Sequence, residues 1–388
     1  MKISPFTWLA LSFFGYYCAY GVFVPFFPVW LKSQSYGAET IGLILASSYL
    51  FRFIGGIFFS ALVKRASQLL NALRYLAWLS CAVMFVIAFL AQTFWLLCGA
   101  IWLFAMLNAA GMPLSDTLAS TWQKQIHLDY GKARLIGSAA FVVGVTLFGY
   151  LIGISGEHYI IWMLTALLGL YAVMQMNSPH TPPHDETESA VENTVTFGQL
   201  LKNRTTLRLL IAISLIQGSH AAYYAYSVLY WTESGISVQT TSLLWGLSVV
   251  AEIVLFFFST RLFKHWNVSR LFYLSALAAA LRWGVLGSTQ ELAVIAAAQL
   301  LHSLTYAASH YAMVRYITTQ PQNTIAKLQG LYNGLSSCAA VALLTALSGV
   351  LYPLSPSLTF AVMSGVALMA LLFIPPKVEA FLLRNEAS

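Results

Sequence analysis

Long apolar segments alternate with short polar segments along almost the whole chain. A helix that crosses a membrane needs roughly 20 apolar residues, because each residue adds about 1.5 Å and the hydrocarbon layer is about 30 Å thick. Twelve segments have this length. They lie at residues 6–31, 41–63, 73–92, 94–120, 131–153, 158–176, 207–231, 239–260, 269–287, 290–316, 325–352 and 356–375. The pattern predicts an all-α membrane protein with twelve transmembrane helices.

One polar segment, "NSPHTPPHDETESAVENTVTFGQLLKN" at residues 177–203, is much longer than the others and rich in Pro, Ser, Thr and acidic residues. Such a composition buries little apolar surface, so we expect this segment to be mobile. It separates two groups of six predicted helices. We therefore predict an N-terminal six-helix bundle at 1–176, a cytoplasmic linker at 177–206 and a C-terminal six-helix bundle at 207–388.

A weak internal repeat supports this division. "ARLIG" at 133–137 and "AKLQG" at 326–330 each open the fifth predicted helix of their half. Parallel repeats of six helices are typical of major facilitator transporters. Together with the helix count, the repeat favours the major facilitator fold with two six-helix pseudo-repeats.

Composition and charge agree with a polytopic membrane protein. Hydrophobic residues make up 59% of the chain and charged residues only 9%, whereas soluble domains carry about 25% charged residues. The net charge is +7, and every Lys and Arg except Lys32, Arg52 and Arg282 lies in one set of loops and ends. By the positive-inside rule both termini are cytoplasmic, so the basic charge reports topology and not nucleic-acid binding.

Neither catalytic nor metal-binding motifs are present in the sequence. It contains no Walker loop, no His-Glu-x-x-His and no nucleophile elbow, so we expect no enzyme activity, no metal site and no cofactor. The cysteines have no metal-ligand spacing and lie in apolar segments, so we expect free, buried thiols. They are Cys18, Cys81, Cys98 and Cys338.

Ionisable residues inside the predicted helices are the candidates for function. Such residues are costly in a bilayer and usually face a bundle interior or an aqueous cavity. The alternative for each is structural pairing between helices, and this alternative weighs most for Arg52 and His310. The set comprises Arg52, Asp116, His220, Glu252, Arg282, His302 and His310.

Two groupings follow from depth along the helices. Asp116 and Arg134 flank the loop between predicted helices 4 and 5 symmetrically, which predicts an intramembrane ion pair. Glu252, His302 and Arg282 lie roughly 20, 15–18 and 8 Å from the outer ends of their helices, so all three can reach one central region. A glutamate there would take up a proton if its arginine were displaced, and the arginine could bind an anion.

Predicted helix 7 contains "SLIQGSHAAYYAYSVLYW". Gln217, His220, Tyr224 and Ser227 fall at i, i+3, i+7 and i+10, which places them on one polar and aromatic face. Such a face suits a cavity that binds a planar aromatic ligand. Anchoring at the membrane interface is the alternative for the aromatic residues at the end of this helix.

Several long runs carry a family resemblance that covers nearly the whole chain. "TWQKQIHLDYGKARLIGS" (121–138), "LIQGSHAAYYAYSVLYW" (215–231), "VVAEIVLFFFS" (249–259) and "LRWGVLGS" (281–288) resemble the phenylpropionate permeases of the major facilitator superfamily. The resemblance implies a monomeric proton-coupled symporter of the bacterial inner membrane. It would import 3-phenylpropionate or a related aromatic carboxylic acid by alternating access, driven by the proton gradient.

A more distant resemblance is to lactose permease, which has counterparts of Asp116, Arg134, Glu252, Arg282 and His302. The positions three before and three after the histidine differ. In lactose permease these two positions hold a lysine and a glutamate, whereas this chain has Gln299 and Thr305. The coupling role of that glutamate therefore does not transfer to Thr305, and Glu252 or His302 must carry the proton. The sugar-stacking aromatic residue of lactose permease aligns with Phe141.

Each candidate residue can be assigned an expected role. The substrate-binding residues are Arg282, His220, Tyr224, Gln217 and Phe141; the proton-coupling residues are Glu252 and His302; the ion pair is Asp116 and Arg134. Arg282 either binds the substrate carboxylate or controls the protonation of Glu252. Two other functions stay open: a sugar or nucleoside proton symporter of the same superfamily, and a membrane sensor that does not transport.

Overall fold

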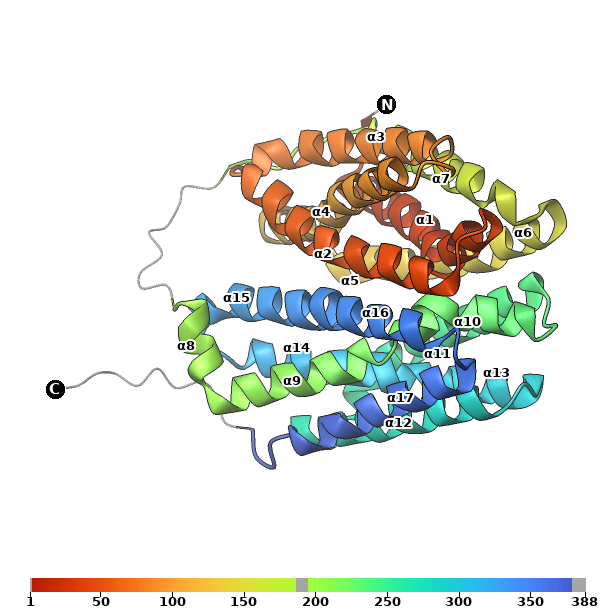
Figure 1. The fold of residues 1–388 in the computed structure, drawn as a ribbon. Coiled ribbons are helices and arrows are strands. Elements are labelled where there is room, and N and C mark those ends of the chain that lie inside the picture. The colour runs from red at the N-terminus through yellow and green to blue at the C-terminus, as the bar shows by residue number, and fades with distance from the viewer. Residues whose placement is uncertain (1, 186–194, 379–388) are drawn as a thin grey trace. The chain divides into compact units, whose positions relative to one another are not determined.

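The structure, a computed structural model, describes residues 2–185 and 195–378 and is built almost entirely of helices, as predicted (Figure 1). Residues 186–194 of the predicted linker and 379–388 at the chain end lie outside the described residues. Within the described chain, ten helices are long and apolar enough to cross a membrane, and Pro356–Leu372 is a shorter apolar helix. The predicted helix 7 is divided into α9 (Arg204–Gly218) and α10 (Ala221–Glu233). The count of twelve stays a prediction.

Two compact units can be distinguished by the contacts within them. The first contains residues 2–185, 223–250 and 345–356, and the second contains 195–222, 251–344 and 357–378. The chain first passes from one unit to the other within the predicted linker, and the further boundaries fall within α10, α11 (Val238–Leu262) and α16 (Val341–Leu351) and at the start of α17 (Pro356–Met369). The predicted bundles at 1–176 and 207–388 therefore stay a prediction.

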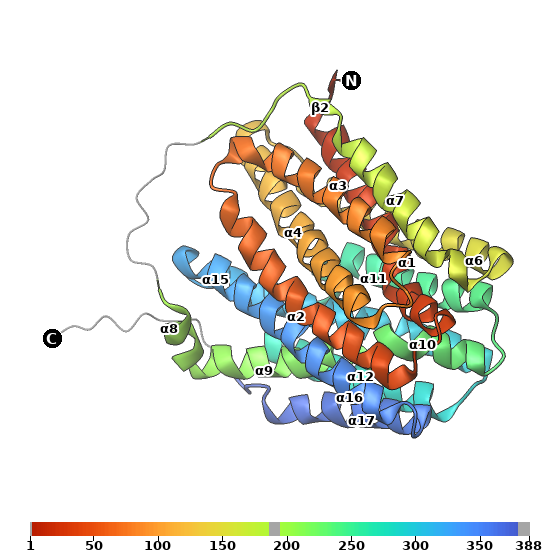
Figure 2. The ribbon, with the colours of Figure 1, turned by 45° about the horizontal axis from the view of Figure 1, so that its top comes forward.

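The first unit begins with seven helices. They are α1 (Pro5–Ser33), α2 (Ala38–Leu62), α3 (Leu69–Ile87), α4 (Phe94–Ile126), α5 (Tyr130–Val143), α6 (Gly149–Ser155) and α7 (Ile160–Gln175). A π-helical turn, Gly144–Phe148, joins α5 to α6, and short 3-10 turns at Ala66–Gln68 and Glu157–Tyr159 precede α3 and α7. Helix α1 packs against α5 and α7, and α4 packs against α2 and α3 (Figure 2).

Helix α1 forms because its start is capped and its length is apolar. Ser4 is the N-cap and accepts a hydrogen bond from the Thr7 amide, and Pro5 occupies the first turn, where its missing N–H costs nothing. Pro25 and Pro28 lie inside the helix, which nevertheless continues to Ser33.

A close helix crossing fixes α2 against α4. A side chain at Gly55 would overlap the backbone of Met106, whereas a side chain at the neighbouring Gly56 would meet nothing within 4 Å. Only glycine allows α2 and α4 to approach this closely at Gly55, as in other membrane helix pairs. The crossing at Gly55 therefore fixes the position of α2 relative to α4.

The start of the linker is ordered, which differs from the expected mobility. Strand β2 (Ser178–Pro179) pairs in parallel with β1 (Lys2–Ile3) at the chain start. Arg74 donates to the carbonyl oxygens of Gln175 and Asn177, and further along Asp185 accepts hydrogen bonds from Ser67. These hydrogen bonds fix residues 177–185 to the first unit despite their polar composition.

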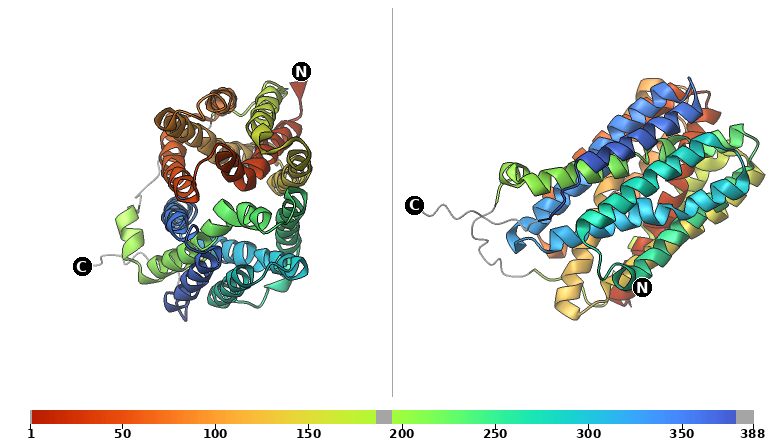
Figure 3. Two further views of the ribbon diagram at one scale, coloured as in Figure 1. Left: turned by 45° about the vertical axis from the view of Figure 1, so that its right-hand side comes forward. Right: turned by 90° about the horizontal axis from the view of Figure 1, so that it is seen from below.

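The second unit contains seven helices besides its parts of α10, α11 and α16. They are α8 (Phe197–Lys202), α9, α12 (Val268–Ser288), α13 (Leu292–Leu300), α14 (Ser309–Thr318), α15 (Gln322–Tyr332) and α17 (Pro356–Met369), with a last turn at Ala370–Leu372. Two π-helical segments, Ser303–Ala308 and Asn333–Ala340, interrupt the helices between α13 and α14 and between α15 and α16. Figure 3 shows these helices in two further views.

The π-helical segments lie at the centre of this unit's packing. Ser303–Ala308 packs against α12, and Asn333–Ala340 packs along α9. The apolar core that includes Leu209, Phe272 and Met313 also contains Ala307 and Ala308 of the first segment. Because π-helical turns shift side chains out of the regular helical register and often occur at functional sites, they direct attention to the residues beside them.

The four cysteines, all of them among the described residues, form no disulfide, as predicted, but only two of them are buried as expected. Cys18 and Cys98 are buried, whereas Cys81 and Cys338 are half-buried.

Candidate functional site

Arg282 of α12 is fully buried in the second unit, with 0% of its surface exposed. Its Nη2 donates to the Gln299 side-chain oxygen at 2.8 Å, and its Nη1 donates to His302 Nδ1 at 2.9 Å. Nη1 also lies 3.5 Å from the hydroxyl oxygen of Thr305. The guanidinium carbon lies 4.7 Å from the centre of the Trp283 ring. A buried cation thus lies among neutral polar groups of the next span and an aromatic face.

His302 connects this cation to an acid. Its Nε2 lies 3.2 Å from Glu252 Oε2, and its Nδ1 faces Arg282. Arginine keeps its charge and can only donate, so His302 Nδ1 must be an acceptor and its hydrogen must be on Nε2. The geometry therefore assigns a neutral imidazole that donates to the Glu252 carboxylate.

His220 extends the network from the point where α9 ends and α10 begins. Its Nδ1 lies 3.1 Å from the carbonyl oxygen of Ile216, which can only accept, so Nδ1 carries the hydrogen. Its Nε2 lies 3.0 Å from the Thr305 hydroxyl and accepts from it. The Thr305 oxygen, in turn, faces Arg282. Thr305 therefore bridges His220 and Arg282 at the position where lactose permease has a glutamate.

The structure thus brings together the three residues that depth along the helices predicted to meet, Glu252, Arg282 and His302. It also adds two partners of Arg282, Gln299 and Thr305, whose role the sequence analysis did not assign. The signal for both was present: they lie three residues before and after His302, on the same side of a helix.

Gln217 belongs to a second buried cluster in the same unit. Its side-chain nitrogen donates to the Tyr332 hydroxyl at 2.8 Å, and its oxygen accepts from Ser336 at 3.3 Å. His310 Nδ1 lies 2.7 Å from the same Tyr332 hydroxyl. Gln217 is only 3% exposed, and both its side-chain nitrogen and its side-chain oxygen make hydrogen bonds to neighbouring segments of the chain.

The predicted polar face of helix 7 is divided by the helix break at Ser219–His220. Gln217 and His220 belong to the second unit, whereas Tyr224 and Ser227 belong to the first. Ser227 accepts a hydrogen bond from the Trp245 indole at 3.0 Å. Because α9 ends at Gly218 and α10 begins at Ala221, the common face of the four residues stays a prediction.

The other predicted residues lie in the first unit. The ring of Phe141 packs edge-on against Tyr20, with centroids 6.2 Å apart. Asp116 accepts a hydrogen bond from the Tyr130 hydroxyl at 2.9 Å, and the Arg134 guanidinium lies 4.5 Å from the Tyr17 ring centre. A direct Asp116–Arg134 ion pair stays a prediction. Tyr130 was not among the predicted site residues, although it lies four residues, one helical turn, before Arg134.

Comparisons with known proteins agree with this architecture. The chain is 37% identical over 380 residues to the "Probable 3-phenylpropionic acid transporter" of Escherichia coli (strain K12), covering 97% of this chain and 99% of that protein. It is 23% identical over 215 residues to the "Uncharacterized transporter YwbF" of Bacillus subtilis (strain 168), covering 55% and 53% of the two chains.

Solved structures show the same fold at low sequence identity. The nucleoside transporter NupG matches with a TM-score of 0.76 at 12% identity, covering 97% of this chain and 100% of that chain. A POT family transporter in complex with 5-aminolevulinic acid matches with a TM-score of 0.69 at 11% identity, covering 95% and 94%. The model of the MFS_1 like family matches residues 6–362. The chain belongs to this family and is a multi-pass membrane transporter of the major facilitator type, not an enzyme.

Proposed function

We propose that this transporter imports 3-phenylpropionate or a closely related aromatic carboxylic acid together with protons. It would act by alternating access, as a monomer in a bacterial inner membrane with both termini in the cytoplasm, with the proton gradient and no cofactor as its energy source. The substrate class is supported by the name of the Escherichia coli relative, which aligns over 97% of this chain.

The hydrogen-bonded series Glu252–His302–Arg282 is the observation that carries proton coupling. With Glu252 ionised, the series contains one negative and one positive charge. A proton that binds Glu252 removes the negative charge, while His302 Nε2 can still donate to the carboxyl group. The buried Arg282 then has no compensating charge within the series, which favours an anion nearby.

Binding of the proton and binding of a carboxylate therefore favour each other. By reciprocity, the negative charge of a bound substrate also favours protonation of Glu252. The pair of ligands is electrically neutral as a whole, which lowers the cost of carrying the acid through a low-dielectric interior.

The two proposed roles of Arg282 make different demands on its contacts. To bind the substrate carboxylate directly, the guanidinium must exchange its hydrogen bonds to Gln299 or His302 for bonds to the ligand. To control the protonation of Glu252, it needs only the contacts it has. Its complete burial supports the second role. Gln217 and His220 are engaged in the same way, whereas Tyr224 and Phe141 lie beside an aromatic cavity of the first unit.

Uptake of labelled 3-phenylpropionate into proteoliposomes with an imposed pH gradient tests the proposal. We expect accumulation against the concentration gradient that collapses on addition of a protonophore. Protein-free vesicles are the essential control, because the neutral acid crosses a bilayer unaided. Competition by sugars and nucleosides, but not by other aromatic acids, would instead support a sugar or nucleoside symporter. Saturable binding of the acid without uptake would support a sensor.

A further inference from the structure

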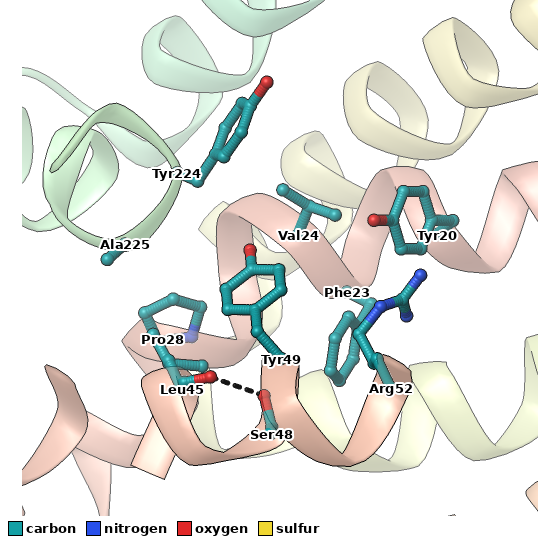
Figure 4. Close-up of a pocket in the computed structure, with 10 residues that line it drawn as sticks. All are labelled: Tyr20, Phe23, Val24, Pro28, Leu45, Ser48, Tyr49, Arg52, Tyr224 and Ala225. Carbon is teal, nitrogen blue, oxygen red and sulfur yellow. Dashed lines mark hydrogen bonds between the residues drawn. The ribbon is translucent and has the colours of Figure 1, made fainter. Parts of the chain in front are cut away.

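A cavity in the first unit combines one cation with several aromatic rings (Figure 4). The space between its lining atoms is about 400 Å³, a volume that includes open solvent. The residues that line it come from α1, α2 and α10. They are Tyr20, Phe23, Val24, Pro28, Leu45, Ser48, Tyr49, Arg52, Tyr224 and Ala225. Arg52 is the cation of this set, and four of the other side chains are aromatic.

Arg52 lies near the middle of its helix. It is roughly 21 Å from the start of α2 at Ala38, which spans 25 residues. Its guanidinium carbon lies 5.4 Å from the centre of the Tyr20 ring, and the Tyr16 hydroxyl is a hydrogen-bond partner. Figure 4 shows the Arg52 guanidinium of α2 beside the Tyr20 ring of α1, whereas Tyr49 points from α2 toward Val24 and Tyr224. An arginine at this depth is costly and marks a functional site by default.

The aromatic walls continue into a second, narrower cavity of the same unit. Both cavities are lined by Tyr20 and Phe23, and the second adds apolar side chains. These include Ala19, Phe104, Leu164 and Leu168. The ring of Phe23 lies 5.3 Å from Phe104, and Tyr20 is backed by Phe141. A cationic end and an apolar end therefore adjoin each other across Tyr20 and Phe23.

We infer that Arg52 binds the carboxylate of the transported acid and that Tyr20 and Phe23 bind its phenyl ring. The inference rests on the proposed function and assigns the substrate-binding site within it. A planar guanidinium can donate two parallel hydrogen bonds to one carboxylate. A phenyl ring packs on an aromatic side chain with ring centres about 4.5–7 Å apart. The Arg52 guanidinium carbon lies 5.4 Å from the Tyr20 ring centre. This distance is similar to the length of the two methylenes that separate the carboxylate of 3-phenylpropionate from its ring, so one molecule could contact both side chains.

This site divides the work between two arginines. Arg52 binds the anion in the first unit, and Arg282 controls the protonation of Glu252 in the second. The α2 residues that line the cavity recur at helical spacing, Leu45, Ser48, Tyr49 and Arg52, so one face of α2 forms a wall.

Binding of two ligands to the purified full-length protein tests the assignment. The ligands are 3-phenylpropionate and its neutral analogue 3-phenylpropanamide, which shares the ring but has no charge. We expect Arg52→Gln to weaken binding of the acid about 10–100-fold and to change binding of the amide less than about threefold, because a hydrogen bond to a charged group is lost only with the acid. Phe23→Ala should weaken both ligands alike.

Arg270→Gln is the matched control, because it removes an exposed guanidinium at the start of α12. If Arg52→Gln leaves the ratio of the two affinities unchanged and Arg282→Gln abolishes the preference for the acid, the carboxylate binds Arg282 and the inference is wrong. If the wild-type protein binds neither ligand, the proposed function is wrong, whichever residue was expected to bind the carboxylate.

A second measurement needs no variant and covers the case in which Arg52→Gln does not fold. Phenylglyoxal modifies accessible arginines, and modified peptides can be quantified by mass spectrometry. We expect 3-phenylpropionate, but not the amide, to slow modification of Arg52 at least about fivefold, as a bound carboxylate covers the guanidinium. Modification of Arg270 should not change. Equal modification of Arg52 with and without the acid would overturn the inference.

Discussion

His302 Nε2 lies 3.2 Å from a carboxylate oxygen of Glu252 inside the second unit. The contact has a fixed direction, because the other imidazole nitrogen accepts from an arginine that cannot give up its proton. The histidine can thus exchange a proton only on the side that faces the glutamate. Glu252 is therefore the residue whose replacement should separate substrate movement from proton movement.

We expect Glu252→Gln to abolish accumulation driven by a pH gradient while substrate exchange across the membrane continues. Glutamine keeps the shape and accepts from His302, but it cannot release a proton. Uptake and counterflow in the same proteoliposomes measure the two activities. Glu291→Gln, at an exposed acid, is the control. Accumulation that still follows the pH gradient in Glu252→Gln would contradict this role.

Arg282→Lys should lower the initial rate of proton-driven uptake by at least tenfold. A lysine ammonium is a point charge, so it cannot reproduce the fork that contacts Gln299 and His302 together. Rates at saturating substrate measure the effect, with Arg270→Lys as the comparison. An unchanged rate and an unchanged apparent affinity would exclude both proposed roles of Arg282.

Replacing Thr305 by Val should destabilise the protein by about 1–3 kcal/mol. The hydroxyl donates to His220 Nε2, and its loss leaves a buried acceptor without a donor. Thermal unfolding of the purified protein, followed by tryptophan fluorescence, measures the loss. Thr305→Ser restores the hydroxyl and should recover most of the stability. Equal melting temperatures for the Val and Ser variants would show that the hydrogen bond contributes little.

Two adjacent glycines of α2 should respond oppositely to alanine. Gly55→Ala places a methyl group against the α4 backbone at Met106 and should cost about 1–3 kcal/mol through overpacking. Gly56→Ala meets nothing within 4 Å and should be neutral or stabilising, because alanine favours helix. Melting temperatures of the two variants decide the matter. Similar values would mean that the crossing can relax.

The contact between Asp185 and Ser67 should depend on pH. Hydrogen bonds from the Ser67 amide, together with its hydroxyl and nearby Arg65, lower the pKa of Asp185. A carboxyl with a lowered pKa stabilises the contact at neutral pH, and this stabilisation is lost as the pH falls through the lowered value. Spin labels at Lys64 and Thr181 should report a short distance at pH 7 that broadens in acid. In Asp185→Asn the distance should not depend on pH.

The membrane helices could be predicted from the sequence because hydrocarbon requires every backbone hydrogen bond to be made within a helix. The meeting of Glu252, Arg282 and His302 followed from the same regularity, since depth along a straight helix is simple to count. The break at Ser219–His220 could not be predicted in this way. At the break, His220 Nε2 lies 3.0 Å from the hydroxyl oxygen of Thr305, a partner 85 residues later that helical spacing does not reveal.

The Arg52 cavity was beyond sequence reasoning for a related reason. Its wall residues on α2 show helical spacing, but Tyr20 and Tyr224 come from segments far away in sequence. Which helices lie beside α2 depends on close crossings such as that at Gly55, where backbone shape and not residue chemistry decides the neighbour. An intramembrane arginine can be recognised from sequence, but its ligand-binding partners require the packing.

The short pairing of β1 with β2 requires an even number of membrane crossings between the two strands. Lys2 pairs with Ser178, and Ile3 pairs with Pro179, so the first residues and the start of the linker lie on one side of the membrane. A chain that returns to its starting side must cross an even number of times, and six apolar helices lie between these strands. A reporter at the N-terminus and another at the start of the linker must therefore face the same compartment. If they faced opposite compartments, one of the six helices would not span the bilayer.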